Sequence, residues 1–151
     1  MPSTLLALAK DEGIKLEWWS FTPPLEAVYW STPNLPPIIG LSYLLKQSSR
    51  AYFRCILAEE IGHHFTTSCN ALPQTLFHYR NRVKVSSAEF KALKWAALYL
   101  LPLDNLLHSL KHGASKKREL AKEFNVTEKI VDFRLNLLDL KIQDKKQIIY
   151  S

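Results

Sequence analysis

The spacing of apolar residues changes along the chain, from one short helical period to strand-like runs and then to long helical periods. Residues 3–12 carry the helical spacing, and Gly13 follows them as a residue that adopts the positive φ of a helix C-cap without strain. The next runs alternate or are rich in strand-forming residues, and prolines between positions 23 and 37 separate them. This pattern predicts a small sheet with irregular connections, with strands at 14–18, 25–30 and 38–41.

From residue 48 onward the pattern is almost wholly helical. The best-defined helix runs to about residue 65, because its large apolar residues recur at helical spacing. After a loop, a short strand is expected at 82–85, and Ser86 is expected to cap a second long helix that Pro102 stops. The sequence therefore predicts an α+β fold, in which a small N-terminal sheet of about three strands packs on a mainly helical body. Further helices are expected at 103–112, at 116–124 and from 128 to about 140.

The length and composition of the chain fit one domain. Its 151 residues are 47% apolar and 11% aromatic, which is enough to fill a single hydrophobic core. We expect one domain, 1–151, in three parts: a helix with the small sheet at 1–45, the motif-bearing helices at 46–112 and a helix-turn-helix-like part at 113–151. The formal net charge of +6 favours an acidic partner surface or weak association with nucleic acid, and it indicates no function by itself.

The sequence predicts a cytoplasmic protein. Its first residues lack a basic segment, and the apolar run there is broken at Lys10 before it reaches the length of a signal sequence. No stretch approaches the roughly 20 apolar residues that span a bilayer, so we expect no membrane partner. The two cysteines, Cys55 and Cys69, are too few for a disulfide framework, which favours a reducing compartment.

Two Glu–His pairs lie in the helix that ends near residue 65. Residues four apart on a helix share a face, so Glu59 and His63 form one potential chelating pair. Glu60 and His64 form a second pair, which is rotated by about 100° around the helix. Glu–His pairs at this spacing are also common on solvated helix faces, so the pairs alone do not establish a metal site.

A third metal ligand would have to come from another element. The next plausible acid is Glu89, near the start of the following long helix. Its alternative role is structural, because Ser86-x-x-Glu89 is a capping-box pattern in which the carboxylate bonds back to the N-cap amide.

Read together, two segments resemble the ImmA/IrrE family of metallopeptidases. The first is AEEIGHH at 58–64, and the second is ExxAxxW at 89–95, in a helix that ends in a leucine-proline step at 101–102. In that family, a helix bearing the H-E-x-x-H motif is followed by a helix that begins E-x-x-A and ends in such a step. The resemblance covers about residues 10 to 140.

The resemblance implies a short sheet beside a zincin-like motif helix, and a divalent metal held by Glu59, His63 and Glu89, with zinc as the expected ion. It also implies that Glu60 is the general base that accepts a proton from the attacking water. One departure matters, because Glu59 stands where most members of the family have His. Two carboxylates and one imidazole are chemically harder ligands than those of the usual zinc site. The set is therefore expected to bind zinc more weakly or to favour another divalent ion.

By resemblance, the chain is expected to be a metal-dependent endopeptidase that cleaves a transcriptional repressor of a mobile element or prophage. The substrate would be a helix-turn-helix repressor protein, and cleavage would relieve repression. The alternative is a non-catalytic regulatory protein, in which the altered first ligand leaves a degenerate metal site and the chain binds DNA or a repressor partner.

The remaining histidines have both chemical and structural interpretations. His64 is a secondary candidate ligand, and His78, in the loop after the motif helix, is a secondary candidate for stabilising an oxyanion. Each also has an ordinary role as a surface or partly buried residue. His108 and His112 are four residues apart, but they lie at a helix end before Gly113, where cationic side chains meet the helix dipole favourably.

The segment at 116–140 resembles a helix-turn-helix. Lys129 and Arg134 would lie on its second helix, and the basic run at 116–118 precedes the first, which is enough for several phosphate contacts. Similar helical endings occur in the ImmA/IrrE family as part of the body. DNA is therefore kept as an alternative partner, behind a packing or docking role.

Overall fold

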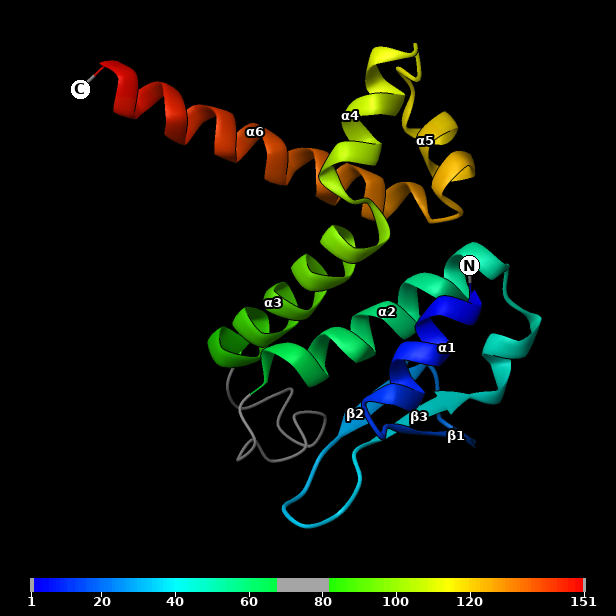
Figure 1. Ribbon diagram of the computed structural model, residues 1–151. Helices are drawn as coiled ribbons and strands as arrows, with labels where there is room; N and C mark the ends of the chain where they lie inside the picture. Colours follow the sequence, from blue (N-terminus) through cyan, green and yellow to red (C-terminus); the bar gives the residue numbers. More distant parts are fainter. Residues whose placement is uncertain (1, 68–81, 151) are drawn as a thin grey trace.

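The computed structural model describes residues 2–67 and 82–150. The chain begins with helix α1 (Pro2–Asp11), continues through strands β1 (Lys15–Trp19), β2 (Ala27–Trp30) and β3 (Ile38–Ser42), and is helical from there on (Figure 1). A sheet near the N-terminus on a helical body confirms the expected α+β class. The later elements are the 3-10 helix η1 (Tyr43–Gln47) and helices α2 (Arg50–Thr66), α3 (Arg82–Leu100), α4 (Leu103–Lys111), α5 (Lys117–Phe124) and α6 (Glu128–Tyr150).

The three strands form a mixed sheet in the order β1-β3-β2. The central strand β3 pairs in parallel with β1 and antiparallel with β2, so β2 lies at an edge of the sheet. Gly40 in β3 has no room for a side chain, because an added Cβ would lie 2.5 Å from the ring of Trp19 on β1. All three strands were expected from the sequence, and their bounds differ from the expected ones by two residues at most.

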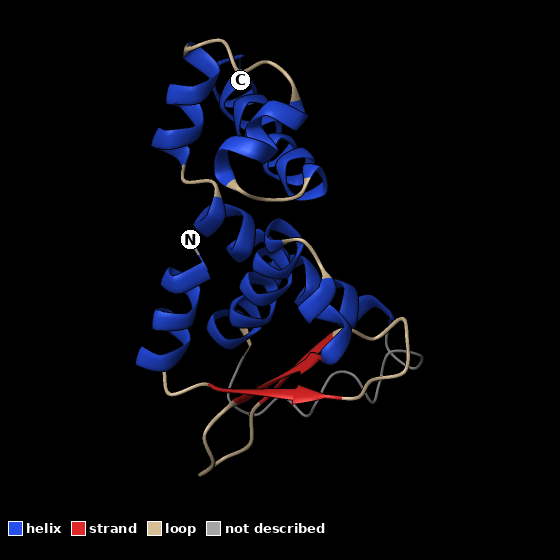
Figure 2. Cartoon of the chain, turned by 90° about the vertical axis from the view of Figure 1, so that its right-hand side faces the viewer, coloured by secondary structure: helices blue, strands red, loops and turns tan. Residues whose placement is uncertain are grey.

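The helices lie on one face of the sheet (Figure 2), and the hydrophobic core fills the space between. Ile39 and Leu41 are two residues apart on β3, so both point to the same face. They are buried together with Leu5 of α1 and with Leu57 and Ile61 of α2. Burial of these side chains, at about 1.5–3 kcal/mol each, fixes α2 against the sheet.

Helix α2 begins where a serine can cap it. The side chain of Ser49 accepts a hydrogen bond from the backbone N–H of Tyr52 at 3.1 Å. Near its other end, α2 packs directly on α3, because a Cβ added at Gly62 would lie 2.5 Å from the carbonyl oxygen of Ala92. The two backbones therefore set how closely side chains on α2 and α3 can approach.

Two expectations about the start of α3 are wrong. Residues 82–85 do not form a strand, because they are the first residues of α3, which starts at Arg82. Ser86 therefore lies inside the helix and is not its N-cap, and the capping-box interpretation of Glu89 fails with it. The valines at 83 and 85 indicated a strand, but each lowers helix propensity by less than about 0.7 kcal/mol. Packing of α3 on α2 outweighs so small a local preference.

The last helix is longer than expected. It was predicted to end near residue 140, but α6 continues for ten more residues to Tyr150. Its final part contains neither glycine nor proline, so nothing in the sequence stops the helix there. None of the helices in the described ranges is long and apolar enough to cross a membrane.

The C-terminal helices lie at the end of the molecule away from the sheet (Figure 1) and are fastened to α2 at the turn between α5 and α6. Asn125 ends α5 in the left-handed conformation, with φ of 52°. The guanidinium of Arg54 on α2 donates to the carbonyl oxygens of Phe124 at 2.5 Å and Asn125 at 3.2 Å. The thiol of Cys55 accepts the backbone N–H of Thr127 at 3.4 Å.

Candidate metal centre

The two Glu–His pairs on α2 point in different directions, as their spacing predicts. Glu59 and His63 turn toward α3, where both meet Glu89. Glu60 and His64 turn toward strand β2, where both meet Tyr29. One helix therefore presents the same residue pair to two different surroundings.

Glu89 connects the first pair. His63 Nε2 lies 3.4 Å from Glu89 Oε2, and the carboxyl group of Glu89 also forms a hydrogen bond with that of Glu59. A bond between two carboxyl groups requires that one of them carry a proton. The His63 side chain is 10% exposed and that of Glu89 is 40% exposed, so the cluster is buried on the α2 side and open on the α3 side.

The charge of this cluster is poorly balanced. Burial raises the pKa of Glu59, and the negative charge of Glu89 raises it further, whereas His63 and Lys129 act in the opposite direction. Burial by itself would lower the pKa of His63, but the hydrogen bond to Glu89 and the nearby carboxylates outweigh it, so that the pKa of this imidazole is raised. The raised pKa of His63, in spite of its burial, indicates excess negative charge around the imidazole, which a cation would offset.

Glu60 lies beside this cluster and is protonated more readily than an ordinary glutamate. Burial raises its pKa to about 7, and the charges of Glu59 and Glu89 add to the effect. The positive charge of His63 and the backbone N–H of Tyr29, which donates to the Glu60 carboxylate, act against it. A carboxylate that gains and loses a proton near neutral pH has the property that a general base needs.

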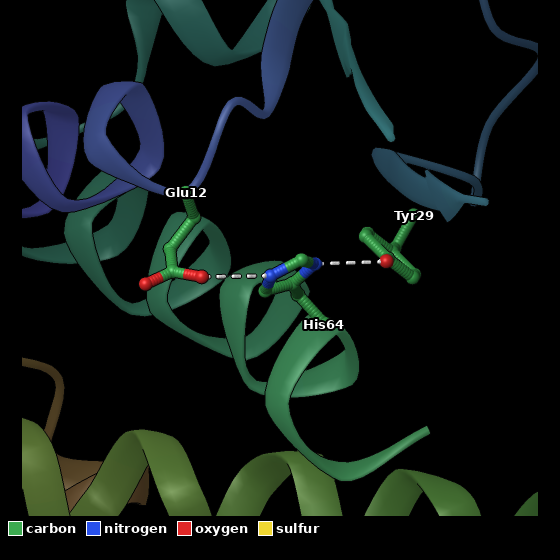
Figure 3. A network of polar contacts seen from close by, with 3 residues as sticks. All are labelled: Glu12, Tyr29 and His64. Atoms are coloured by element: carbon green, nitrogen blue, oxygen red, sulfur yellow. Dashed lines mark hydrogen bonds and ion pairs between the residues drawn. The ribbon is translucent and has the colours of Figure 1, made fainter. Parts of the chain in front are cut away.

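His64 takes part in a separate network with Tyr29 and Glu12 (Figure 3). Its Nδ1 lies 3.0 Å from the hydroxyl of Tyr29, and its Nε2 lies 3.2 Å from a carboxylate oxygen of Glu12. Both ring nitrogens are therefore engaged. In this arrangement His64 has no nitrogen left to act as the secondary metal ligand that the sequence offered.

The residues of the first cluster fit a divalent metal ion in chemical kind. They supply an imidazole and two carboxylates from two helices; burial and then the charge of Glu89 raise the pKa of Glu59, and the hydrogen bond to Glu89 raises that of His63 against the effect of its burial. Within residues 2–67 and 82–150, no three acidic, histidine or cysteine side chains already surround one point closely enough to hold an ion. Glu89 instead bonds separately to Glu59 and His63, and its exposure allows it to change position.

The other candidate histidines are not part of this centre as described. His78 lies outside the described residues. The rings of His108 and His112 lie with centroids 4.0 Å apart and a tilt of 31° at the exposed C-terminal end of α4, and Nδ1 of His112 lies 2.7 Å from the backbone carbonyl oxygen of His108. These contacts agree with the helix-end role expected for that pair.

The C-terminal basic residues are less available to a nucleic acid than their sequence indicated. Arg134 is 2% exposed, and its Nε donates to the carbonyl oxygen of Leu101 at 2.9 Å. Lys117 forms an ion pair with Asp132 on α6. Lys129 is exposed, but its charge acts on Glu59.

Three residues that organise the centre were not singled out from the sequence. Gly62 did carry a signal, because a glycine inside a helix costs about 1 kcal/mol relative to alanine and so indicates a close approach by another backbone. Tyr29 and Glu12 carried none. They lie 35 and 52 positions from His64, and no local pattern connects residues so far apart.

A comparison with known protein families covers the segment that carries the centre. The family described as peptidase M78, IrrE N-terminal-like domain, matches residues 23–136. The matched segment is well over half of the chain and contains β2, β3, α2 and α3, whereas α1 and β1 precede it. The comparison with curated proteins found no match.

Proposed function

Because the chain belongs to the M78 peptidase family, whose membership implies a metallopeptidase, we propose that it is a zinc-dependent endopeptidase with a helix-turn-helix repressor of a mobile element or prophage as its substrate. In this proposal Glu59, His63 and Glu89 hold the metal and Glu60 is the general base. A substrate that acts on the chromosome would place the reaction in the cytoplasm.

The observation that carries the proposal is the concentration of carboxyl groups around His63. Three carboxyl groups, those of Glu59, Glu60 and Glu89, lie around His63. Burial, and then the charge of the neighbouring carboxylates, raises the pKa values of Glu59 and Glu60, so ionisation of these groups is unfavourable without a cation. A divalent ion bound by two of these carboxylates and the imidazole would offset this charge.

The chain's own residues then have distinct tasks. Zinc, when bound, would supply a Lewis acid that polarises the scissile carbonyl group. Glu60 accepts one proton from the attacking water as the new carbon–oxygen bond forms. The same carboxyl group later gives this proton to the leaving amine as the carbon–nitrogen bond breaks, so no other proton donor is required. The backbone N–H of Tyr29 holds the Glu60 carboxylate during both transfers.

The repressor substrate is supported by the resemblance to the ImmA/IrrE family, in which such repressors are cleaved. The test is to incubate the zinc-loaded protein with the repressor encoded beside it and to identify new chain ends by mass spectrometry. Glu60→Gln is the matched control, because the amide keeps the size of the side chain but accepts no proton. Its cleavage rate should fall by roughly 10²- to 10⁴-fold while zinc stays bound. Cleavage by the variant at the wild-type rate would exclude Glu60 as the base.

A further inference from the structure

Tyr29 on the edge strand contacts α2 at two positions that are one helical turn apart. Its backbone N–H donates to the carboxylate of Glu60, and its hydroxyl bonds Nδ1 of His64 at 3.0 Å. Glu60 and His64 are four residues apart, which corresponds to about 6 Å along the helix axis. The tyrosine side chain is long enough to span this distance, so one residue of β2 lies along one face of α2.

His64 is held in turn by Glu12, which follows α1 (Figure 3). A single neutral tautomer of His64 satisfies both contacts, with Nε2–H donating to the Glu12 carboxylate and Nδ1 accepting the hydroxyl proton of Tyr29. The His64 side chain is 21% exposed and that of Glu12 is 37% exposed, so water screens the network only in part. The residue that follows α1, helix α2 and strand β2 therefore meet at one imidazole.

An edge strand needs such a support. Strand β2 pairs only with β3 within the described sheet, and Tyr29 lies opposite Ile39 in that register. The other side of an edge strand has no neighbouring strand to fix its backbone groups. A four-residue strand held on one side can shift by fractions of an ångström, and a hydrogen bond from its amide to Glu60 would weaken with such a shift.

We infer that Tyr29 is a positioning residue for Glu60: its hydroxyl, anchored by His64 and Glu12, fixes strand β2 so that the Tyr29 amide binds the Glu60 carboxylate. The positional part of this inference stands on the contacts alone. Its consequence for catalysis rests on the proposed function. The ligands Glu59, His63 and Glu89 lie on the neighbouring face of α2, so loss of the anchor should leave metal binding unchanged.

The test measures hydrogen exchange at the amide of residue 29 by NMR in the full-length, zinc-loaded protein. Tyr29→Phe keeps the ring and the amide but removes the anchored hydroxyl. Exchange at residue 29 should become roughly two- to ten-fold faster, as expected for the loss of one hydrogen bond, whereas the amide of Ile39 in the sheet interior should be unaffected. Tyr52→Phe is the matched control, because it removes another hydroxyl that bonds a carboxylate, that of Glu26, without touching β2 at Tyr29.

Glu12→Gln gives a second, milder disturbance at a distance from the metal ligands, in case Tyr29→Phe does not fold. It should accelerate exchange at residue 29 in the same direction. Unchanged exchange at residue 29 in both variants would overturn the inference, as would an equal acceleration at Ile39, which would indicate general loss of stability.

Kinetics separate this inference from the proposed function. If the wild type cleaves the repressor, Tyr29→Phe should lower kcat with KM and zinc content unchanged, since only the base is disturbed. A fall in zinc content would overturn the positioning role. If the wild type does not cleave, the proposed function fails, and the exchange rates still decide the positional part.

Discussion

The two Glu–His pairs of α2 are identical in sequence spacing and opposite in their surroundings. Glu59 and His63 face another acid, so their charges stay unbalanced. Glu60 and His64 face Tyr29, whose amide and hydroxyl supply a partner for each. The first pair therefore carries charge that a cation would offset, and each member of the second pair has a partner on Tyr29.

The difference shows that spacing on a helix determines which residues share a face, but the element opposite determines their chemistry. A rotation of about 100° moves a pair from α3 to the sheet. The proposed assignment of ligands and base relies on this difference, and substitutions at four positions can break or sharpen it.

The largest effect is expected from Glu89→Ala, which removes the acid that connects the first pair. Loss of a residue that only supports a metal ligand typically lowers metal affinity by roughly 10- to 100-fold. Loss of a ligand should lower zinc affinity by at least as much. Competition with a coloured chelator on metal-free protein measures this. Replacing both His108 and His112 with Asn is the control for weak zinc binding by this exposed pair. The double substitution should leave the zinc affinity of the proposed centre unchanged. Equal affinity of wild type and Glu89→Ala would remove Glu89 from the centre.

Gly62→Ala should separate the two pairs. The added Cβ would lie 2.5 Å from the Ala92 carbonyl oxygen, so the α2–α3 contact must widen at a cost of about 1–3 kcal/mol in the free energy of unfolding. Zinc affinity should fall because Glu89 moves away, whereas exchange at the Tyr29 amide should stay as in the wild type. Urea unfolding and zinc titration measure these quantities. A variant with wild-type stability and affinity would show that this contact does not position Glu89.

A smaller effect concerns the pH dependence of stability in chelator-treated protein. The pKa of Glu60 is about 7 in the folded chain, against an ordinary value of 4.5, so the folded state keeps a proton that the unfolded chain releases. This group stabilises the fold fully below the unfolded pKa, and its contribution is lost as the pH rises through about 7. Glu60→Gln has no such loss, so its stability should fall less than that of the wild type between pH 5 and pH 8. Urea unfolding measures the free energy of unfolding of the wild type and of Glu60→Gln at each pH, with a substitution at an exposed position, Glu128→Gln, as control. Parallel pH dependence of the wild type and Glu60→Gln would contradict the prediction.

The smallest effect is expected from Glu59→His, which restores the commoner first ligand on the same helix face. Borderline zinc binds imidazole at least as well as carboxylate, so the affinity should stay equal or increase. Glu59→Ala should bind zinc more weakly than either. If neither substitution changes the affinity, Glu59 is not a ligand, and the first pair contributes only His63.

Most of the fold could be predicted because its signals are local. The change from strand-like to helical periods located the sheet. Gly13 indicated the end of the first helix, and in the structure it adopts the expected positive φ, of 69°. The start of α3 was misjudged because valine spacing favours a strand only weakly, and contacts with α2 decide the outcome. The end of α6 was set too early although no stop signal stands there.

The centre could be predicted only in outline. Spacing placed Glu59 with His63 and Glu60 with His64, and Glu89 was the next plausible acid, to which the resemblance gave the role of third ligand. The structure brings Glu89 next to the first pair. Nothing in the sequence distinguished which pair would be satisfied by the sheet. That answer depends on Tyr29, which approaches α2 only after the strands have paired.

The contacts that hold the C-terminal helices have a consequence for how the sequence can vary. Arg54 and Arg134 both donate to carbonyl oxygens, those of Phe124, Asn125 and Leu101. Every residue has a backbone carbonyl oxygen, whatever its side chain. Each of these contacts therefore depends on the identity of the arginine and not on that of the residue that accepts the hydrogen bond. Lysine should not replace either arginine, because it lacks the planar donor group. At the positions that accept these hydrogen bonds, the bonds themselves should tolerate any side chain.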